Sequence, residues 1–308
     1  MSGATSSDGA ASADVVIAPT PREGSSMPDP HLLVTDLMFG ESPRWHDDRL
    51  WVSDWGAREI IAVDLTGTRD IIARAPSFPC CIDFLRDGCL LMVSADDGLL
   101  VRREPDGSLV TQADLSGLSG RTWNEIVVDG RGNTYINGSG FDLRAGEAFE
   151  RGIVAVVTPD GSARLVADGL AFPNGMAVTP DNVTLIVAES YANKLTAFDI
   201  AADGSLSNRR VWADLGDGVP DGICLDADSA VWYADVPNKR CVRVREGGEV
   251  LQTVALDRGC FACMLGGVDG RTLFLVVREW RGYESMDDSS RTSQVLTIEA
   301  PASGVGWP

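Results

Sequence analysis

The chain has 308 residues, of which 44% are hydrophobic, so it is long enough to bury a substantial core in one or two domains. Its formal net charge of −19, from 45 acidic and 26 basic residues, argues against a nucleic acid or an anionic membrane as a partner. The apolar runs, such as residues 273–277, are strand-sized and far shorter than the roughly 20 residues that a membrane helix needs. We therefore expect neither a nucleic acid nor a membrane as a partner.

Both ends of the chain differ in composition from its centre. Residues 1–30 are rich in Ser, Ala, Gly, Asp and Pro and lack the apolar stretch of a secretory signal, so we predict a disordered N-terminal tail. Residues 301–308 are expected to form a short C-terminal tail. The seven cysteines are an odd number without an export signal, which favours reduced, buried thiols and a cytoplasmic location. A lone CxxC motif, Cys260 to Cys263, has neither a second pair nor a nearby His and is a weak zinc signal.

From residue 31 onwards, one pattern recurs six times. Each copy has a head residue, an apolar strand, a turn rich in Asp, Gly or Asn, and a second apolar strand. In the fourth copy the head is Asn174, the turn is 180–182 and the second strand is 184–188. In chain order, the six heads are Glu41, Cys80, Asn124, Asn174, Asp221 and Cys263.

The spacing of the heads indicates the fold. Successive heads lie 39 to 50 residues apart, which is the length of a four-stranded propeller blade. Six such units predict an all-β, six-bladed β-propeller that occupies residues 31–300 as a single domain. Two three-bladed halves or stacked β-sandwiches are the alternative. The longest insertion, residues 138–150, is a candidate lid over one face.

Four of the six heads are polar, and their chemistry suggests a metal site. In a propeller the innermost strands line the central channel, so equivalent positions of different blades converge. The carboxylates Glu41 and Asp221 and the carboxamides Asn124 and Asn174 offer the oxygen ligands that suit a hard divalent cation. Without a cation, two facing carboxylates would repel and one would bind a proton. The alternative is that the heads only cap strands and bind channel water.

Several segments, in this order and at blade spacing, resemble the SMP-30/gluconolactonase family. They are residues 40–45, Asn124 with the Val-Val-Asp-Gly that ends at Gly130, residues 172–177 and residues 220–223. The resemblance covers about residues 35–298 and implies a six-bladed propeller with one divalent cation in its channel. The cation would be Ca²⁺ first, with Mg²⁺, Mn²⁺ or Zn²⁺ as alternatives.

The resemblance also implies roles for individual residues. Glu41, Asn174 and Asp221 match the metal ligands, and Asn124 matches a neighbouring residue that contacts the substrate. The family's usual reaction is hydrolysis of sugar lactones, and related members act on other lactones or on phosphorus esters. The expected partner is therefore a small-molecule lactone or ester.

One departure from the family pattern lies beside the expected site. The family often has an Arg two residues before the substrate-contacting Asn, whereas Arg121 lies three residues before Asn124 and Trp123 intervenes. The role of Arg121 is therefore open, although it is a candidate to hold a substrate hydroxyl or carboxylate. Trp123, as a second candidate substrate contact, suggests a more apolar or aromatic-faced substrate than a plain sugar lactone.

The chemistry follows from the residue types. A cation held by the heads would polarise a carbonyl, and Asp221 is the better general base because its carboxylate borders the open position. Catalysis by Ser, His and Asp is disfavoured, since the only histidines are His31 and His46. The alternatives are a phosphotriester or other ester hydrolase on the same metal, and a calcium-binding or ligand-binding propeller without turnover. A monomer or weak homo-oligomer is expected.

Residues at the ends of the second strands have simpler predicted roles. Asp54, Glu189, Asp235 and Glu279 lie at the ends of such strands, and we expect them to be solvated strand ends. Trp55 is a candidate pocket residue. Trp232, within a strand, is expected to pack between blades.

Overall fold

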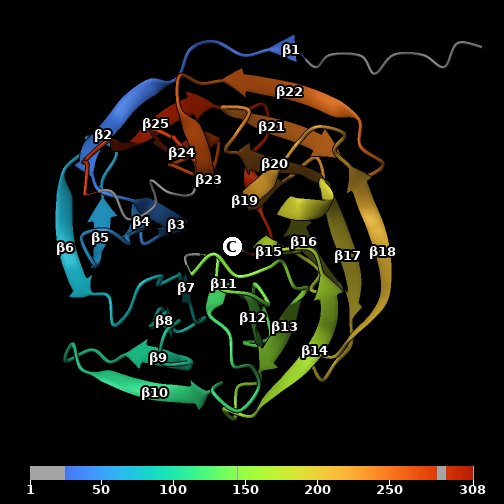
Figure 1. Ribbon diagram of the computed structural model, residues 1–308. Helices are drawn as coiled ribbons and strands as arrows, with labels where there is room; N and C mark the ends of the chain where they lie inside the picture. The colour runs from blue at the N-terminus through green and yellow to red at the C-terminus, as the bar shows by residue number, and fades with distance from the viewer. Residues whose placement is uncertain (1–24, 144, 283–288, 308) are drawn as a thin grey trace, which may run out of the picture.

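The computed structural model describes residues 25–143, 145–282 and 289–307. These residues form six sheets around a central axis, so the chain is a six-bladed β-propeller, as the sequence predicts (Figure 1). A single turn of 3₁₀ helix, Ser190–Ala192, is the one helical element in the described part of the chain. No helix there is long and apolar enough to cross a membrane. Of the predicted disordered tail, residues 1–30, the first 24 residues lie outside the described part.

Each blade has four antiparallel strands, which in blades 1 to 5 run in chain order from the axis outwards, whereas β2 (His31–Leu37) from the N-terminal side is the outermost strand of blade 6. Blades 1 to 3 comprise β3 (Gly40–His46), β4 (Arg49–Asp54), β5 (Glu59–Val63) and β6 (Arg69–Arg74); β7 (Ile82–Phe84), β8 (Leu90–Ser94), β9 (Leu99–Arg103) and β10 (Leu109–Asp114); and β11 (Trp123–Val128), β12 (Thr134–Gly138), β13 (Gly152–Val157) and β14 (Ala163–Leu170). Blades 4 to 6 comprise β15 (Pro173–Val178), β16 (Thr184–Glu189), β17 (Lys194–Ile200) and β18 (Leu206–Asp214); β19 (Pro220–Asp226), β20 (Ala230–Asp235), β21 (Arg240–Arg245) and β22 (Val250–Ala255); and β23 (Gly259–Gly266), β24 (Thr272–Arg278), β25 (Ser293–Glu299) and β2 (His31–Leu37).

The two ends of the described chain close the ring. Strand β2, from the N-terminal side, is the outermost strand of blade 6 and pairs with β25. Strand β1 (Ser25–Ser26) adds to the outer edge of blade 5, and β26 (Gly304–Val305) pairs with the inner strand β19. Beyond β26, Trp307 exchanges backbone hydrogen bonds of 2.6 and 2.9 Å with Val178 of blade 4. The segment after residue 300 thus crosses the channel at the end opposite the strand heads.

Burial decreases from the inner strands to the outer ones, which explains the sequence pattern of each unit. The second strands β8 and β20 are buried along their whole length and consist almost entirely of apolar residues. Outer strands such as β6 and β10 lie mostly at the surface and carry charged residues. Apolar side chains between neighbouring blades form the core, where Trp232 is fully buried as expected.

Glycines after two of the heads allow the inner strands to approach one another. A Cβ atom on Gly175 would lie 2.5 Å from the carbonyl oxygen of Asp221, and one on Gly222 would lie 2.7 Å from the Cβ of Ala262. The Asn-Gly and Asp-Gly pairs are therefore not hairpin turns here. They sit at the start of inner strands, where only glycine leaves room for the next blade.

The strand register corrects one predicted head. In blades 4 and 5 the residue before the head pairs with the last residue of the second strand, as Pro173 does with Glu189. In blade 6 the corresponding residue is Gly259, which pairs with Arg278, so the head is Cys260. The prediction of Cys263 as the head of blade 6 was wrong. The motif contains two cysteines, and no polar residue in it indicates which one stands at the head position. Both thiols are buried and free.

Three of the four acidic residues at the ends of the second strands are buried, contrary to the prediction that they are solvated, whereas Glu279 is exposed as predicted. The side chains of Glu189 and Asp235 are 0% exposed, and Asp54 is 2% exposed. The Asp54 carboxylate accepts hydrogen bonds from the backbone N–H groups of Met38 and Phe39 at 3.0 and 2.9 Å. The Glu189 carboxylate likewise accepts a hydrogen bond from the Ala171 backbone N–H at 2.7 Å, so Asp54 and Glu189 fix the loops that lead into β3 and β15.

Candidate functional site

A deep pocket opens at the end of the channel where the inner strands begin. Its volume is about 580 Å³, within the range of small-molecule sites in proteins. The polar groups at its floor come from the heads of blades 1, 3, 4 and 5 and from one residue beside them. They are Glu41, Asn124, Glu125, Asn174 and Asp221.

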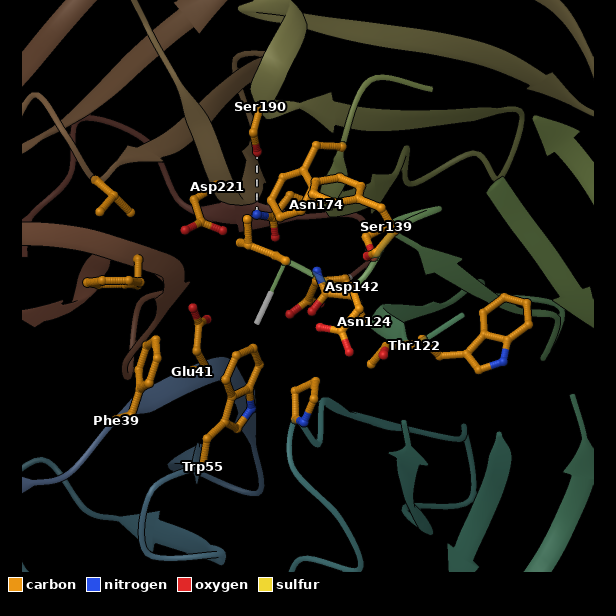
Figure 2. A pocket seen from close by; sticks show the side chains of 18 of the residues that line it. Phe39, Glu41, Trp55, Thr122, Asn124, Ser139, Asp142, Asn174, Ser190 and Asp221 are labelled. Atoms are coloured by element: carbon orange, nitrogen blue, oxygen red, sulfur yellow. Dashed lines mark hydrogen bonds between the residues drawn. The ribbon is translucent and has the colours of Figure 1, made fainter. Parts of the chain in front are cut away.

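The three expected metal ligands point into one space. Figure 2 shows Glu41 from β3, Asn174 from β15 and Asp221 from β19 converging from three blades. Asn124, from β11, lines the same pocket. The inner strands thus bring together the four polar heads that the sequence places more than 40 residues apart.

The electrostatics of this floor disfavour two free carboxylates. Burial, followed by repulsion from Asp221 and Glu125, raises the pKa of Glu41 well above its ordinary value. Burial and the charge of Glu125 likewise raise the pKa of Asp221, whereas a hydrogen bond with Asn174 works in the opposite direction. A positive charge placed between these groups would remove the repulsion and keep them ionised.

The donor set fits a hard divalent cation. Two carboxylates and one amide oxygen converge, and calcium, magnesium and manganese prefer oxygen ligands of this kind. Among the described residues, no group of three or more His, Cys, Asp or Glu side chains is placed to hold a metal ion. The expected ligand set contains only two carboxylates, because its third ligand is the amide oxygen of Asn174.

Hydrogen bonds behind the floor connect the heads of adjacent blades. The side chain of Asn137, on β12, accepts a hydrogen bond from the Glu125 backbone N–H (3.3 Å) and donates one to the Asn174 carbonyl (2.6 Å). The Ser190 hydroxyl donates to the Pro220 carbonyl at 2.6 Å and accepts a hydrogen bond from the Asn174 amide at 3.4 Å. The positions of Asn174 and Asp221 are therefore fixed from blades 3 and 4.

The buried Glu125 at the floor and its buried partner Arg44 were not predicted from the sequence. Glu125 lines the pocket beside Asn124, and its carboxylate accepts hydrogen bonds from Arg44 at 3.4 Å and from the Cys81 thiol at 3.1 Å. Arg44 also contacts Asp83 (3.4 Å) and donates to the Ile126 carbonyl (2.6 Å). The sequence carried one signal for Glu125. This residue directly follows the predicted head Asn124, whereas a glycine, Gly175, follows the head of blade 4.

The two further candidate substrate contacts lie away from the floor. Arg121 is partly exposed and forms an ion pair with Glu147 at 2.7 Å, and it is not one of the described residues that line the pocket. Trp123 belongs to the pocket wall, but its side chain is fully buried in the core between blades 2 and 3. Trp55, in contrast, lines the pocket as expected.

The insertion after β12 contributes to the pocket. Its lining residues are Ser139, Phe141, Asp142, Leu143 and Ala145. In Figure 2, Ser139 and Asp142 of this insertion lie on the opposite side of the pocket from Trp55 and Phe39. The insertion therefore shapes the pocket as part of its wall.

Comparison with known proteins identifies relatives of three kinds. The chain is 32% identical to regucalcin of Xenopus laevis over 131 residues, which are 41% of this chain and 44% of that protein. It is 26% identical to the pentonolactonase XacC of Haloferax volcanii over 248 residues, 71% of this chain and 81% of the relative. Identity with the diisopropyl-fluorophosphatase of Loligo vulgaris is 28% over 200 residues, 58% of this chain and 63% of that enzyme.

Solved structures share the fold. A calcium-binding regucalcin from Agrobacterium tumefaciens superposes with a TM-score of 0.76 at 20% identity, over 92% of this chain and 97% of that one. At the level of sequence families, residues 39–278 match the SMP-30/Gluconolactonase/LRE-like region. This match extends from the start of blade 1 to the end of β24 and includes every residue of the pocket floor. The chain therefore belongs to the SMP-30/gluconolactonase family.

Proposed function

We propose that this protein is a divalent-metal-dependent hydrolase that opens a lactone ring in the channel pocket. The observation that carries the proposal is the convergence of Glu41, Asn174 and Asp221 at the polar floor of a deep pocket. Family membership and the similarity to a pentonolactonase support the same reaction class.

In this proposal Glu41, Asn174 and Asp221 would hold the cation, Ca²⁺ first, which would supply Lewis-acid polarisation of the lactone carbonyl. The Asp221 carboxylate accepts a proton from a water molecule as that water attacks the carbonyl carbon. When the tetrahedral intermediate collapses, the ring C–O bond breaks and the proton passes from Asp221 to the leaving alkoxide. The product is the open hydroxy acid.

The remaining polar groups position the reactants. Asn124 offers an amide that hydrogen-bonds to the oxygens of the lactone ring, and the Ser190 and Asn137 side chains hold the strands that carry the floor. Arg121 is a candidate contact only for a substrate that extends to the exposed edge of the insertion, where this residue pairs with Glu147.

The test is hydrolysis of a panel of sugar and aliphatic lactones by protein stripped with a chelator, before and after addition of Ca²⁺, Mg²⁺, Mn²⁺ or Zn²⁺. We expect turnover that disappears on stripping and returns with one of these ions. Turnover that persists at the same rate in the stripped protein would argue against metal dependence.

A second reaction class is favoured by one comparison. The similarity to a diisopropyl-fluorophosphatase suggests phosphorus esters as alternative substrates for the same floor. Measurable cation binding together with hydrolysis of a phosphotriester but of no lactone would select this alternative. Cation binding without turnover of either class would instead favour a calcium-binding or ligand-binding propeller.

A further inference from the structure

The upper part of the pocket has a different chemistry from its floor. Above the heads, the described lining is dominated by aromatic and aliphatic side chains that come from every blade. An enzyme that binds a sugar lactone would need polar partners for several substrate hydroxyl groups in this upper part of the pocket. The composition of this wall therefore bears on which substrate the pocket accepts.

One side of the pocket is a continuous row of rings, here called the long aromatic wall. Its members, in spatial order, are Phe78, Trp55, Phe39, Phe261 and Trp280. Neighbouring ring centroids lie 5.0 to 5.7 Å apart, and all five residues line the pocket. The wall belongs to blades 6, 1 and 2, so it extends over about half of the ring.

A second group of rings lies on the side of blades 3 and 4 and is here called the insertion wall. Its members are Phe141, Phe149, Phe172 and Tyr191. Phe141 and Phe172 line the pocket with ring centroids 5.6 Å apart, and Tyr191 stacks behind Phe172 at 4.7 Å. Blade 5 completes the circle with the aliphatic residues Val219, Val236 and Pro237.

Besides the floor residues, five polar residues line the pocket, namely Asp96, Thr122, Ser139, Asp142 and Ser190, and two of their hydroxyl groups already donate to the protein. The Ser139 hydroxyl donates to the Phe141 carbonyl at 2.6 Å, and the Ser190 hydroxyl donates to the Pro220 carbonyl at 2.6 Å. Wherever a polyhydroxylated substrate lies against the two aromatic walls, it would replace hydrogen bonds to water with contacts to aromatic carbon, which is unfavourable. An apolar group would instead gain burial and ring stacking on the same surface.

On these grounds we infer that the substrate carries an aryl or similarly bulky apolar group that lies between the long aromatic wall and the insertion wall. This inference rests on the proposed function, because it places the lactone carbonyl at the polar floor. The pocket volume of about 580 Å³ supports it, since a cavity of this size accommodates more than a bare lactone ring. The specificity-determining residues are Phe141 and Trp55.

The test compares a phenyl-substituted δ-lactone with glucono-δ-lactone, as kcat/KM divided by the uncatalysed rate of each compound. We expect the phenyl lactone to be favoured about tenfold or more. Phe141→Ala should reduce this preference about tenfold, whereas Phe149→Ala should leave it unchanged, because Phe149 belongs to the same cluster but does not line the pocket. A preference for gluconolactone would overturn the inference while leaving the hydrolase proposal intact.

A binding measurement separates the two proposals. The corresponding phenyl-substituted and hydroxylated lactams, which the reaction does not open, are titrated into the wild-type protein by calorimetry. Tighter binding of the phenyl lactam supports the inferred substrate class even if no lactone is hydrolysed. The lack of hydrolysis would then refute only the proposed hydrolase. Equal binding, tighter binding of the hydroxylated lactam, or binding of neither would overturn the inference. The melting temperature of each variant excludes misfolding as the cause of a change.

Discussion

The side chain of Asn137 donates a hydrogen bond to the backbone carbonyl of Asn174 across 2.6 Å, and so connects the second strand of blade 3 with the head of blade 4. The same side chain accepts from the backbone of Glu125, so one amide fixes two floor residues. Asn137 is fully buried and does not line the pocket. It therefore acts on the site through the residues that it positions.

Replacement of Asn137 should weaken cation binding without abolishing the fold. Asn137→Ala leaves the Asn174 carbonyl and the Glu125 N–H without this partner, and we expect the affinity for Ca²⁺ to fall about 10-fold to 100-fold. Calorimetric titration checks this, with Thr111→Ala at an exposed position of β10 as the control. An unchanged affinity in Asn137→Ala would show that the bond does not position the floor.

The substitution Asp221→Asn distinguishes the role of Asp221 as a general base from its role as a ligand of the cation. The amide keeps an oxygen that can bind a cation but cannot accept a proton at neutral pH, so we expect kcat to fall about 10²-fold to 10⁴-fold. Cation affinity, measured in parallel, should fall much less. If the variant hydrolyses lactones at the wild-type rate, Asp221 is not the general base.

Gly175→Ala should destabilise the contact between blades 4 and 5. The added Cβ would lie 2.5 Å from the Asp221 carbonyl and 2.6 Å from the Ile223 nitrogen, both backbone atoms that move only with β19. We expect a loss of about 1–3 kcal/mol in the free energy of unfolding, measured by urea denaturation. Gly117→Ala is the control, because no atom lies within 4 Å of a Cβ at that position. Equal stability of the two variants would contradict the close approach of the inner strands.

The buried Glu189 should make stability depend on pH. Burial alone would raise its pKa, but hydrogen bonds from Thr196 and Ala171 and the charges of Lys194 and Arg209 outweigh burial and lower it. A lowered pKa in the folded state means that the ionised form stabilises the protein above the ordinary carboxyl value of about 4.3. This contribution disappears as the pH falls through the lower, folded-state pKa.

Glu189→Gln tests this dependence. We expect the wild type to exceed the variant in free energy of unfolding by about 1–3 kcal/mol at pH 7, and the difference to vanish in strong acid. Urea denaturation across this pH range measures both values. A difference that does not change with pH would show that the ionised carboxylate is not the stabilising form.

The fold and the polar heads could be predicted because they depend on local patterns. An apolar strand, a turn and a second apolar strand recur in every unit, and the innermost position of each unit must face the axis. Asn174 and Asp221 accordingly stand near the start of inner strands, as this pattern predicts. The head of blade 6 was misplaced, since neither Cys260 nor Cys263 gives a polar signal, and only the pairing of Gly259 with Arg278 fixes the register.

The remainder of the site depends on contacts between blades, which no local pattern reports. Arg44 reaches the carboxylate of Glu125, 81 residues further along the chain, because blades 1 and 3 converge on the same axis. The burial of Glu189 and Asp235 was missed for a different reason, since the side chains that pair with them, such as Arg209 and Arg240, lie on outer strands of the same blade. The long aromatic wall brings Phe39 and Phe261 together only when β2 closes the ring against β25.

The most direct test of the central claim is the rate of lactone hydrolysis by stripped protein as a function of added Ca²⁺, measured beside the calcium-binding curve. If Glu41, Asn174 and Asp221 hold a catalytic ion, activity and binding should rise together and saturate at one ion per chain. Full activity in the stripped protein, or saturated binding without turnover of any lactone, would contradict the proposed metal-dependent lactone hydrolase.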